Sequence, residues 1–288
     1  MRPVPLTPLA SQYDAFLLDL DGSVWIGDDA TPGAVEAIDA VRAAGRSVAF
    51  VTNDSRHPPE EFVRKLWRLG FRASVEEVVT VGGALQHALN ERHAGRAAFV
   101  IGSDAVVGHV ADAGLRVVNG TTFASRAEVV VVAGHAGFDY AELRVATQAV
   151  LRGADLVGAA RDRTFPMPDG PWPGHGAVLA AVETATDVRG WTVGKPEPQL
   201  FLTALDRTGG TRALVVGDRL DADVAGAAAA GLDAAVVLTG GTGEDQAREA
   251  LEAARTQRAR AAEGPATEDG PAGGLVAVAP TLAALLLS

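Results

Sequence analysis

A short apolar run that ends in two aspartates constrains the fold of this chain more than any other segment. Residues 15–18 are Ala-Phe-Leu-Leu, and Asp19-Leu20-Asp21-Gly22 follows directly. Successive side chains of an extended segment alternate between faces, so Asp19 and Asp21 point to the same side at the carboxyl end of a predicted buried strand. Two carboxylates this close in an apolar setting need a compensating cation or a shared proton. Gly22 permits a sharp turn there and brings backbone N–H groups close to an anionic ligand.

Strand and helix patterns alternate through the first third of the chain. Residues 23–30 predict a small hairpin flap beside the two aspartates. After it we expect a helix from Thr31-Pro32 to Gly45, a strand at 47–52, and a helix from Pro58-Pro59 to Gly70. This alternation is typical of parallel sheets, in which ligands bind outside the carboxyl ends of the strands. Thr52 and Asn53 end the second strand, so we expect them to meet the aspartates.

The middle third continues the alternation and predicts an inserted α/β domain. The expected strands are 97–101, 116–118, 127–133 and 155–159, and the expected helices are 104–114, 140–151 and 177–185. Residues 161–176 are rich in proline and glycine and predict a long ordered loop. The first pattern resumes at Trp191. The predicted domains are therefore an α/β, doubly wound (Rossmann-like) parallel-sheet core at 1–90 and 191–288, with the insertion at 91–190.

The last third again brings polar residues to the ends of predicted elements. Lys195 precedes a helix that ends at Asp206, and a strand at 213–216 leads into Gly217-Asp218-Arg219-Leu220-Asp221-Ala222-Asp223. A charged helix is expected at 244–262 and a final core strand and helix at 275–287. Between them, residues 263–274 are rich in glycine and proline and predict a mobile surface excursion.

Two of the 25 basic residues are lysines, Lys65 and Lys195. A Gly-Lys-Pro turn that keeps lysine in an arginine-rich chain favours a role for the compact ammonium group, because the two cations are not interchangeable. Lys65 lies on the polar face of a predicted helix and is expected to be solvated. Residues 190–195 are not a phosphate-binding P-loop, because proline replaces the Ser or Thr that binds magnesium. The six histidines lack the paired spacing of zinc ligands.

Composition narrows the classes of partner. The net charge of −11 and a pI near 5.0 argue against a nucleic-acid polymer, whose binders carry a basic face. A small phosphorylated substrate stays possible, because a metal ion and a lysine can reverse the local charge. The chain has no cysteine, no signal-peptide pattern at its start and no apolar run long enough for a membrane span, so we expect a cytoplasmic protein.

Four motifs in this order resemble the haloacid dehalogenase (HAD) superfamily of phosphohydrolases. Within it the chain is similar to the NagD-like, class IIA group, which includes p-nitrophenyl phosphatases and phosphoglycolate phosphatases. The motifs are Asp19-Leu20-Asp21-Gly22, Val51-Thr52-Asn53, Gly194-Lys195-Pro196 and Gly217-Asp218 with Asp223 five residues on. The resemblance covers nearly the whole chain. An insertion between the second and third motifs implies a C2-type α/β cap domain on a HAD core.

The resemblance also implies a magnesium-dependent phosphomonoester hydrolase. Asp19 would be the nucleophile that forms an aspartyl-phosphate, and Asp21 would protonate the leaving oxygen and then activate water. Mg²⁺ would be held by Asp19, the backbone carbonyl of Asp21 and Asp218, with Asp223 acting through water or by supporting a ligand. All of these metal contacts are oxygen atoms.

The phosphoryl oxygens would be bound by Thr52 and Lys195, aided by backbone N–H groups near Gly22 and Asn53. The substrate implied is a small sugar, polyol, glycolate or nucleoside phosphate. Two departures from the family pattern put that substrate in question: Asp54 follows Asn53, where the family commonly has a second Asn, and residues 159–163 read Ala-Ala-Arg-Asp-Arg.

Two alternative functions remain open, and a second copy of the chain is an expected partner. A phosphoryl sensor could use the same Asp, Thr and Lys without turnover, although Asp21 would shorten the life of the phosphoryl adduct. A phosphomutase would transfer the group to a second substrate instead of water. Caps in this family can also mediate dimers, so a homodimer through the cap is expected.

Overall fold

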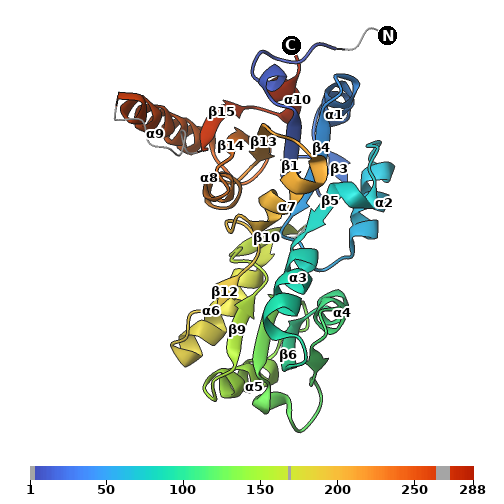
Figure 1. Ribbon diagram of the computed structural model, residues 1–288, viewed down its shortest axis with the longest axis vertical. Coiled ribbons are helices and arrows are strands. Elements are labelled where there is room, and N and C mark those ends of the chain that lie inside the picture. Colours follow the sequence, from blue (N-terminus) through green and yellow to red (C-terminus); the bar gives the residue numbers. More distant parts are fainter. Residues whose placement is uncertain (1–3, 168–169, 264–272) are drawn as a thin grey trace. The chain divides into compact units, whose positions relative to one another are not determined.

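The computed structural model describes residues 4–167, 170–263 and 273–288, and these form two compact units (Figure 1). The first unit contains the described residues up to Thr52, Pro59–Val79 and those from Lys195 onward. The second unit contains Asn53–Pro58 and Thr80–Gly194. The second unit is thus an insertion in the first, as the sequence motifs indicate.

A six-stranded sheet organises the first unit. Its strand order is β15 (Leu275–Ala279), β14 (Asp233–Val237), β13 (Ala213–Gly217), β1 (Ala15–Asp19), β4 (Ser47–Thr52) and β5 (Val78–Thr80). The strands that follow β1 are therefore added first on one side of it (β4, β5) and later on the other (β13, β14, β15). Strand β1 runs parallel to both of its neighbours, with Leu18 opposite Val216 and Asp19 opposite Val51. This register brings the carboxyl ends of β1, β4 and β13 to one edge.

Helices cover both faces of this sheet. Alternate strand residues such as Phe16, Leu18 and Phe50 form one fully buried core with α1 (Ala34–Ala43), α2 (Pro59–Arg68) and α10 (Leu282–Leu286). On β14, Val236 joins a separate core with α9 (Glu244–Glu263). Two further helices, α7 (Gln199–Thr208) and α8 (Ala225–Ala229), contact β1 and β14 respectively. The predicted doubly wound core is confirmed.

The second unit has its own parallel sheet. The strand order is β12 (Trp191–Thr192), β9 (Asp155–Gly158), β8 (Val129–Gly134), β6 (Ala97–Gly102) and β7 (Arg116–Val117). Its helices are α3 (Val81–His93), α4 (Asp104–Asp112), α5 (Tyr140–Val150) and α6 (His175–Thr186). Buried residues of β6, β8 and β9 pack with α5 and α6 in one apolar core. The predicted inserted α/β domain is therefore present.

Two hairpins complete the two units. The predicted flap is the antiparallel pair β2 (Trp25–Ile26) and β3 (Asp29–Ala30). The prediction of a loop at 161–176 is wrong, because β10 (Thr164–Met167) pairs with β11 (Gly170–Pro173) there. Pro166 faces Pro171, and Pro173 faces Thr164, two positions along. These prolines fall in the same class of ladder pair, so none has to donate a backbone N–H group.

The unit boundaries lie elsewhere than the predicted domain limits of 90 and 191. Helix α3 belongs to the second unit, and neither α3 nor β5 was expected from the sequence. The remaining short helices are η1 (Ala10–Gln12), η2 (Val75–Glu77), η3 (Ala124–Arg126) and η4 (Leu220–Val224). Most of the predicted surface excursion at 263–274 falls outside the described residues. Within the described parts, none of the helices is both long and apolar enough to cross a membrane.

Candidate active site

Polar side chains gather where the central strands of the first unit end. Asp19 is the last residue of β1, Thr52 is the last of β4, and Asp218 directly follows β13. Asp223 lies in the π-helical turn η4 that follows. Each of these side chains belongs to a residue that is at most 6% exposed. Several buried polar groups, three of them carboxylates, therefore lie at the edge of the sheet where these strands end.

Lys195 lies between two of these carboxylates. Its Nζ donates hydrogen bonds to Asp19 Oδ1 at 2.5 Å and to Asp223 Oδ1 at 2.7 Å, and the lysine is 4% exposed. The other oxygen of Asp223 accepts the backbone N–H of Arg219 at 3.1 Å. Burial alone would lower the pKa of Lys195, but the charges of Asp19 and Asp223 raise it above its usual range. The lysine is therefore charged.

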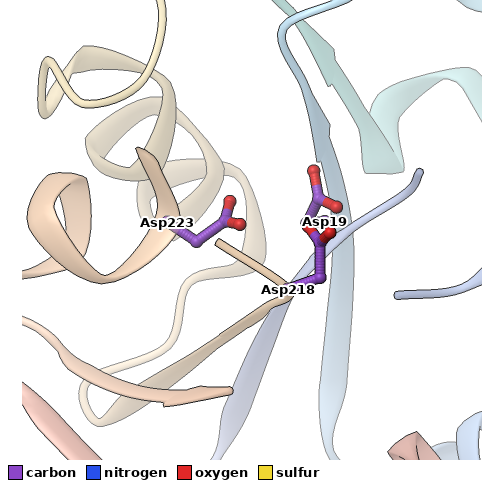
Figure 2. Close-up of side chains that lie close together, drawn as sticks. All are labelled: Asp19, Asp218 and Asp223. Carbon is purple, nitrogen blue, oxygen red and sulfur yellow. The ribbon is translucent and has the colours of Figure 1, made fainter. Parts of the chain in front are cut away.

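Asp19, Asp218 and Asp223 lie close enough to bind one metal ion (Figure 2). One carboxylate oxygen from each lies within 4.8 Å of the others. Burial raises the pKa of Asp19 well above its usual range although Lys195 opposes it, and burial with the nearby charge of Asp223 raises the pKa of Asp218 to about 6. One ammonium neutralises only one of three carboxylates. A divalent cation that prefers oxygen ligands, such as Mg²⁺, fits the remaining charge.

A glycine-rich loop after β14 holds Asp218 in place. The backbone N–H of Gly241 donates to Asp218 Oδ2 at 2.5 Å, and Thr239 Oγ1 donates to the carbonyl of Gly22 at 2.5 Å. A Cβ atom on Gly240 or Gly22 would overlap the Asp218 carboxylate. The sequence pattern alone assigns this loop no function. The signal that could have identified it is the Gly240-Gly241 pair, which begins three residues after β14 ends.

The turn after β1 differs from the sequence prediction at Gly22. Its φ is +89°, which fits a glycine, but its N–H donates to the Trp25 carbonyl at 2.8 Å instead of facing an open site. Asp21 is half-buried, and its Oδ1 accepts the indole N–H of Trp25 at 2.9 Å. Ser23 Oγ donates to Asp19 Oδ2 at 3.3 Å. The sequence pattern predicts Trp25 only as part of the flap and does not reveal its contact with Asp21.

Asn53 and Asp54 belong to the second unit. The side-chain amide of Asn53 donates a hydrogen bond to Asp162 Oδ2 at 2.8 Å and thus contacts a carboxylate of the same unit. Asp54 accepts hydrogen bonds from the backbone N–H, Nε and Nη2 of Arg56 at 2.6–2.9 Å. Burial opposes them, but hydrogen bonds from His57 and Arg56 hold the pKa of Asp54 well below its usual range. Asp54, the residue that departs from the family motif, therefore holds the backbone and the side chain of Arg56 in the segment that follows β4.

Two family models match the parts of this chain that contain the four motifs. A family model described as haloacid dehalogenase-like hydrolase matches residues 16–116, and a HAD-hydrolase-like model matches residues 192–260. D-glycerol 3-phosphate phosphatase of Mycobacterium tuberculosis is 39% identical over 233 residues. The match covers 81% of this chain but 65% of that protein, which is therefore longer.

Two further matches cover a larger share of the matched protein. Acid sugar phosphatase of Staphylococcus aureus is 32% identical over 231 residues, which is 80% of this chain and 88% of that protein. The crystal structure of a glycerol phosphate phosphatase from M. tuberculosis in complex with magnesium superposes with a TM-score of 0.81 at 34% identity, covering 97% of this chain and 78% of that one. These matches confirm the predicted fold class and agree with a phosphatase that uses magnesium.

The close approach of Gly240 to Asp218 generates a prediction about metal affinity. Gly240→Ala places a methyl group against the Asp218 carboxylate and is expected to weaken Mg²⁺ binding by about 10- to 100-fold in titration calorimetry. Gly243→Ala is the matched control, because a Cβ at Gly243 meets no atom within 4 Å. Equal Mg²⁺ affinities in the two variants would contradict the assignment of Asp218 as a metal ligand.

A buried histidine generates a prediction about pH and the second unit. Burial lowers the pKa of His175 from 6.5 although Asp162 and Asp54 oppose the shift. The unfolded chain then binds more protons than the folded one below pH 6.5, so the free energy of unfolding should fall as the pH drops below that value. Denaturant titrations from about pH 8 to about pH 5 should show a weaker pH dependence in His175→Gln than in wild type. His87→Gln, at an exposed histidine, should match wild type.

Proposed function

The chain belongs to the haloacid dehalogenase-like hydrolases, and from this membership we propose that it hydrolyses small phosphomonoesters with Mg²⁺. The observation that carries the proposal is the buried group of Asp19, Lys195, Asp218 and Asp223 at the carboxyl edge of the core sheet. This group combines a nucleophile, a cation and an oxygen-ligand set. Phosphoryl transfer depends chiefly on such positioning and charge neutralisation.

The carboxylates present suit Mg²⁺, which prefers a few carboxylates together with water and phosphate oxygens. Asp19 and Asp218 would hold the ion together with the backbone carbonyl of Asp21. Asp223 would act through water and through its hydrogen bond to Lys195. When bound, the ion supplies positive charge to the phosphoryl oxygens and to the buried carboxylates.

The first chemical step uses both aspartates of the opening motif. An oxygen of Asp19 attacks phosphorus, and the bond from phosphorus to the leaving oxygen breaks with its electron pair on that oxygen. Asp21, in its protonated form, gives its proton to the leaving oxygen. The products are an alcohol and a phosphoryl group on Asp19. Lys195 neutralises charge beside Asp19, and the Thr52 hydroxyl would bind a phosphoryl oxygen.

The second step returns the enzyme to its starting state. Asp21, now a carboxylate, accepts a proton from water as the water oxygen attacks phosphorus. The bond between phosphorus and Asp19 breaks, and inorganic phosphate leaves. Asn53 remains a proposed contributor through its backbone N–H, on the strength of the second motif alone.

The substrate class we propose is a small phosphorylated sugar, polyol, glycolate or nucleoside. Relatives named for glycerol 3-phosphate and for acid sugars support the polyol and sugar members of this set. We further propose that the second unit is a C2-type cap that selects the leaving group, that it mediates a homodimer, and that the protein acts in the cytoplasm.

Phosphate release from a panel of phosphomonoesters, with Mg²⁺ and with excess chelator, tests the proposal. Wild type should release phosphate only with Mg²⁺, and Asp19→Asn should lower kcat by about 10³-fold or more. Asp221→Asn serves as the matched control, because Asp221 lies in the same motif as Asp218 but is 71% exposed and pairs with Arg219. Its activity should equal that of wild type.

Two outcomes would contradict the proposal. Chelator-resistant release would remove Mg²⁺ from the reaction. Near-normal turnover in Asp19→Asn would remove Asp19 as the nucleophile.

A further inference from the structure

We propose that Trp25 is a positioning residue that orients the carboxylate of Asp21 for proton transfer, and that Lys65 fixes the Trp25 ring. This inference rests on the proposed function, because it assigns work to the acid and base of that reaction. All three residues lie in the first unit. The juxtaposition that carries it is a continuous line of contacts from the helix α2 through the flap to Asp21.

The contact between Trp25 and Asp21 is short and buried at the ring. Trp25 is 1% exposed, and its Nε1–H donates to Asp21 Oδ1 at 2.9 Å. The backbone also joins Trp25 to both chain neighbours of Asp21, because Gly22 N–H donates to the Trp25 carbonyl and Trp25 N–H donates to the Leu20 carbonyl. The indole and the carboxylate therefore keep a fixed relation to each other, set by one closed turn.

Lys65 contacts the face of the Trp25 ring. The Nζ of Lys65 lies 4.3 Å from the ring centroid, which is cation–π geometry, and 4.0 Å from Asp28 of the flap. The Lys65 side chain is 23% exposed. The expectation that Lys65 is simply solvated is thus wrong. Both lysines of the chain serve the region around Asp19 and Asp21, one directly and one through an aromatic ring.

The orientation of Asp21 matters because proton transfer needs the donor oxygen within hydrogen-bond reach of the leaving oxygen. The indole N–H occupies Oδ1 and leaves Oδ2 as the oxygen that carries the transferred proton. Without the indole N–H, the carboxylate can rotate about its χ2 torsion, and fewer enzyme molecules hold Oδ2 at the leaving group. The rate of the first step should fall most when the leaving oxygen is strongly basic and needs a proton to depart.

This requirement distinguishes positioning from a general structural role. Glycerol phosphate has an alkoxide leaving group and depends on the acid, whereas p-nitrophenyl phosphate has a weakly basic leaving group and depends on it little. Trp25→Phe keeps a ring for Lys65 but removes the indole N–H. We expect kcat/KM, which covers the steps up to departure of the leaving group, to fall about 10-fold for glycerol phosphate and to change little for p-nitrophenyl phosphate. Asp21→Asn should show the same pattern in kcat/KM with a larger loss, and its kcat should fall for both substrates because the second step needs Asp21 as the base in either case.

The ratio of the two kcat/KM values is the measured quantity, because both are taken on one preparation and the active fraction cancels. A partly misfolded Trp25→Phe preparation would therefore still give a valid ratio. Trp67→Phe is the matched control: Trp67 lies on α2, as Lys65 does, and donates its indole N–H to the Ala73 carbonyl, and it is 61% exposed. Its ratio should equal that of wild type.

Lys65→Met tests the second half of the inference. Removing the cation frees the ring, and the ratio should move in the same direction by about threefold. An unchanged ratio in Trp25→Phe, or an equal loss with both substrates, would overturn the positioning role. An unchanged ratio in Lys65→Met would overturn the role of Lys65. Absence of phosphate release by wild type would instead overturn the proposed function, and this inference with it.

Discussion

The pair of hydrogen bonds from Lys195 to Asp19 and Asp223 is the interaction on which the rest of the site depends. It brings the segment before α7 against the ends of β1 and η4, so three parts of the chain meet at one charge. Removing one member of a buried ion pair costs about 3–5 kcal/mol, because the partner is left charged and unpaired. The arrangement still leaves negative charge uncompensated, which is the physical reason for the metal ion that we propose at Asp19 and Asp218. A cluster built only for stability would not need that excess.

The sheet makes this concentration of charge possible. Parallel strands of β1, β4 and β13 supply apolar side chains to both faces, and their carboxyl ends share one edge. Asp19 and Asp218 therefore meet although 199 positions separate them in the sequence. The glycine-rich loop at Thr239–Gly241 closes over Asp218, and Gly22 leaves room for that carboxylate. Small residues are needed there because a Cβ atom would occupy the space of the carboxylate itself.

The sequence predicted the doubly wound core, the insertion and the residues that form the charged cluster, because each depends on local pattern and on strand order. It did not predict the contacts that arise from tertiary packing. Trp25 was part of a flap with no assigned partner, and Lys65 had the spacing of a solvated helix residue. Neither the indole contact with Asp21 nor the ring contact with Lys65 follows from spacing, since both depend on how the flap folds back on α2. The hairpin at β10 and β11 was hidden by its prolines, which tolerate pairing because they occupy ladder positions that need no N–H donor.

The central claim is that Asp19 carries the phosphoryl group between the two steps. Rapid acid quenching of wild type during turnover of a phosphomonoester with Mg²⁺, followed by peptide mass spectrometry, tests it most directly. The account predicts a phosphoryl group on the peptide that contains Asp19, located on that side chain and absent when chelator replaces Mg²⁺. Turnover with no adduct on Asp19, or with the group on another residue, would contradict the account.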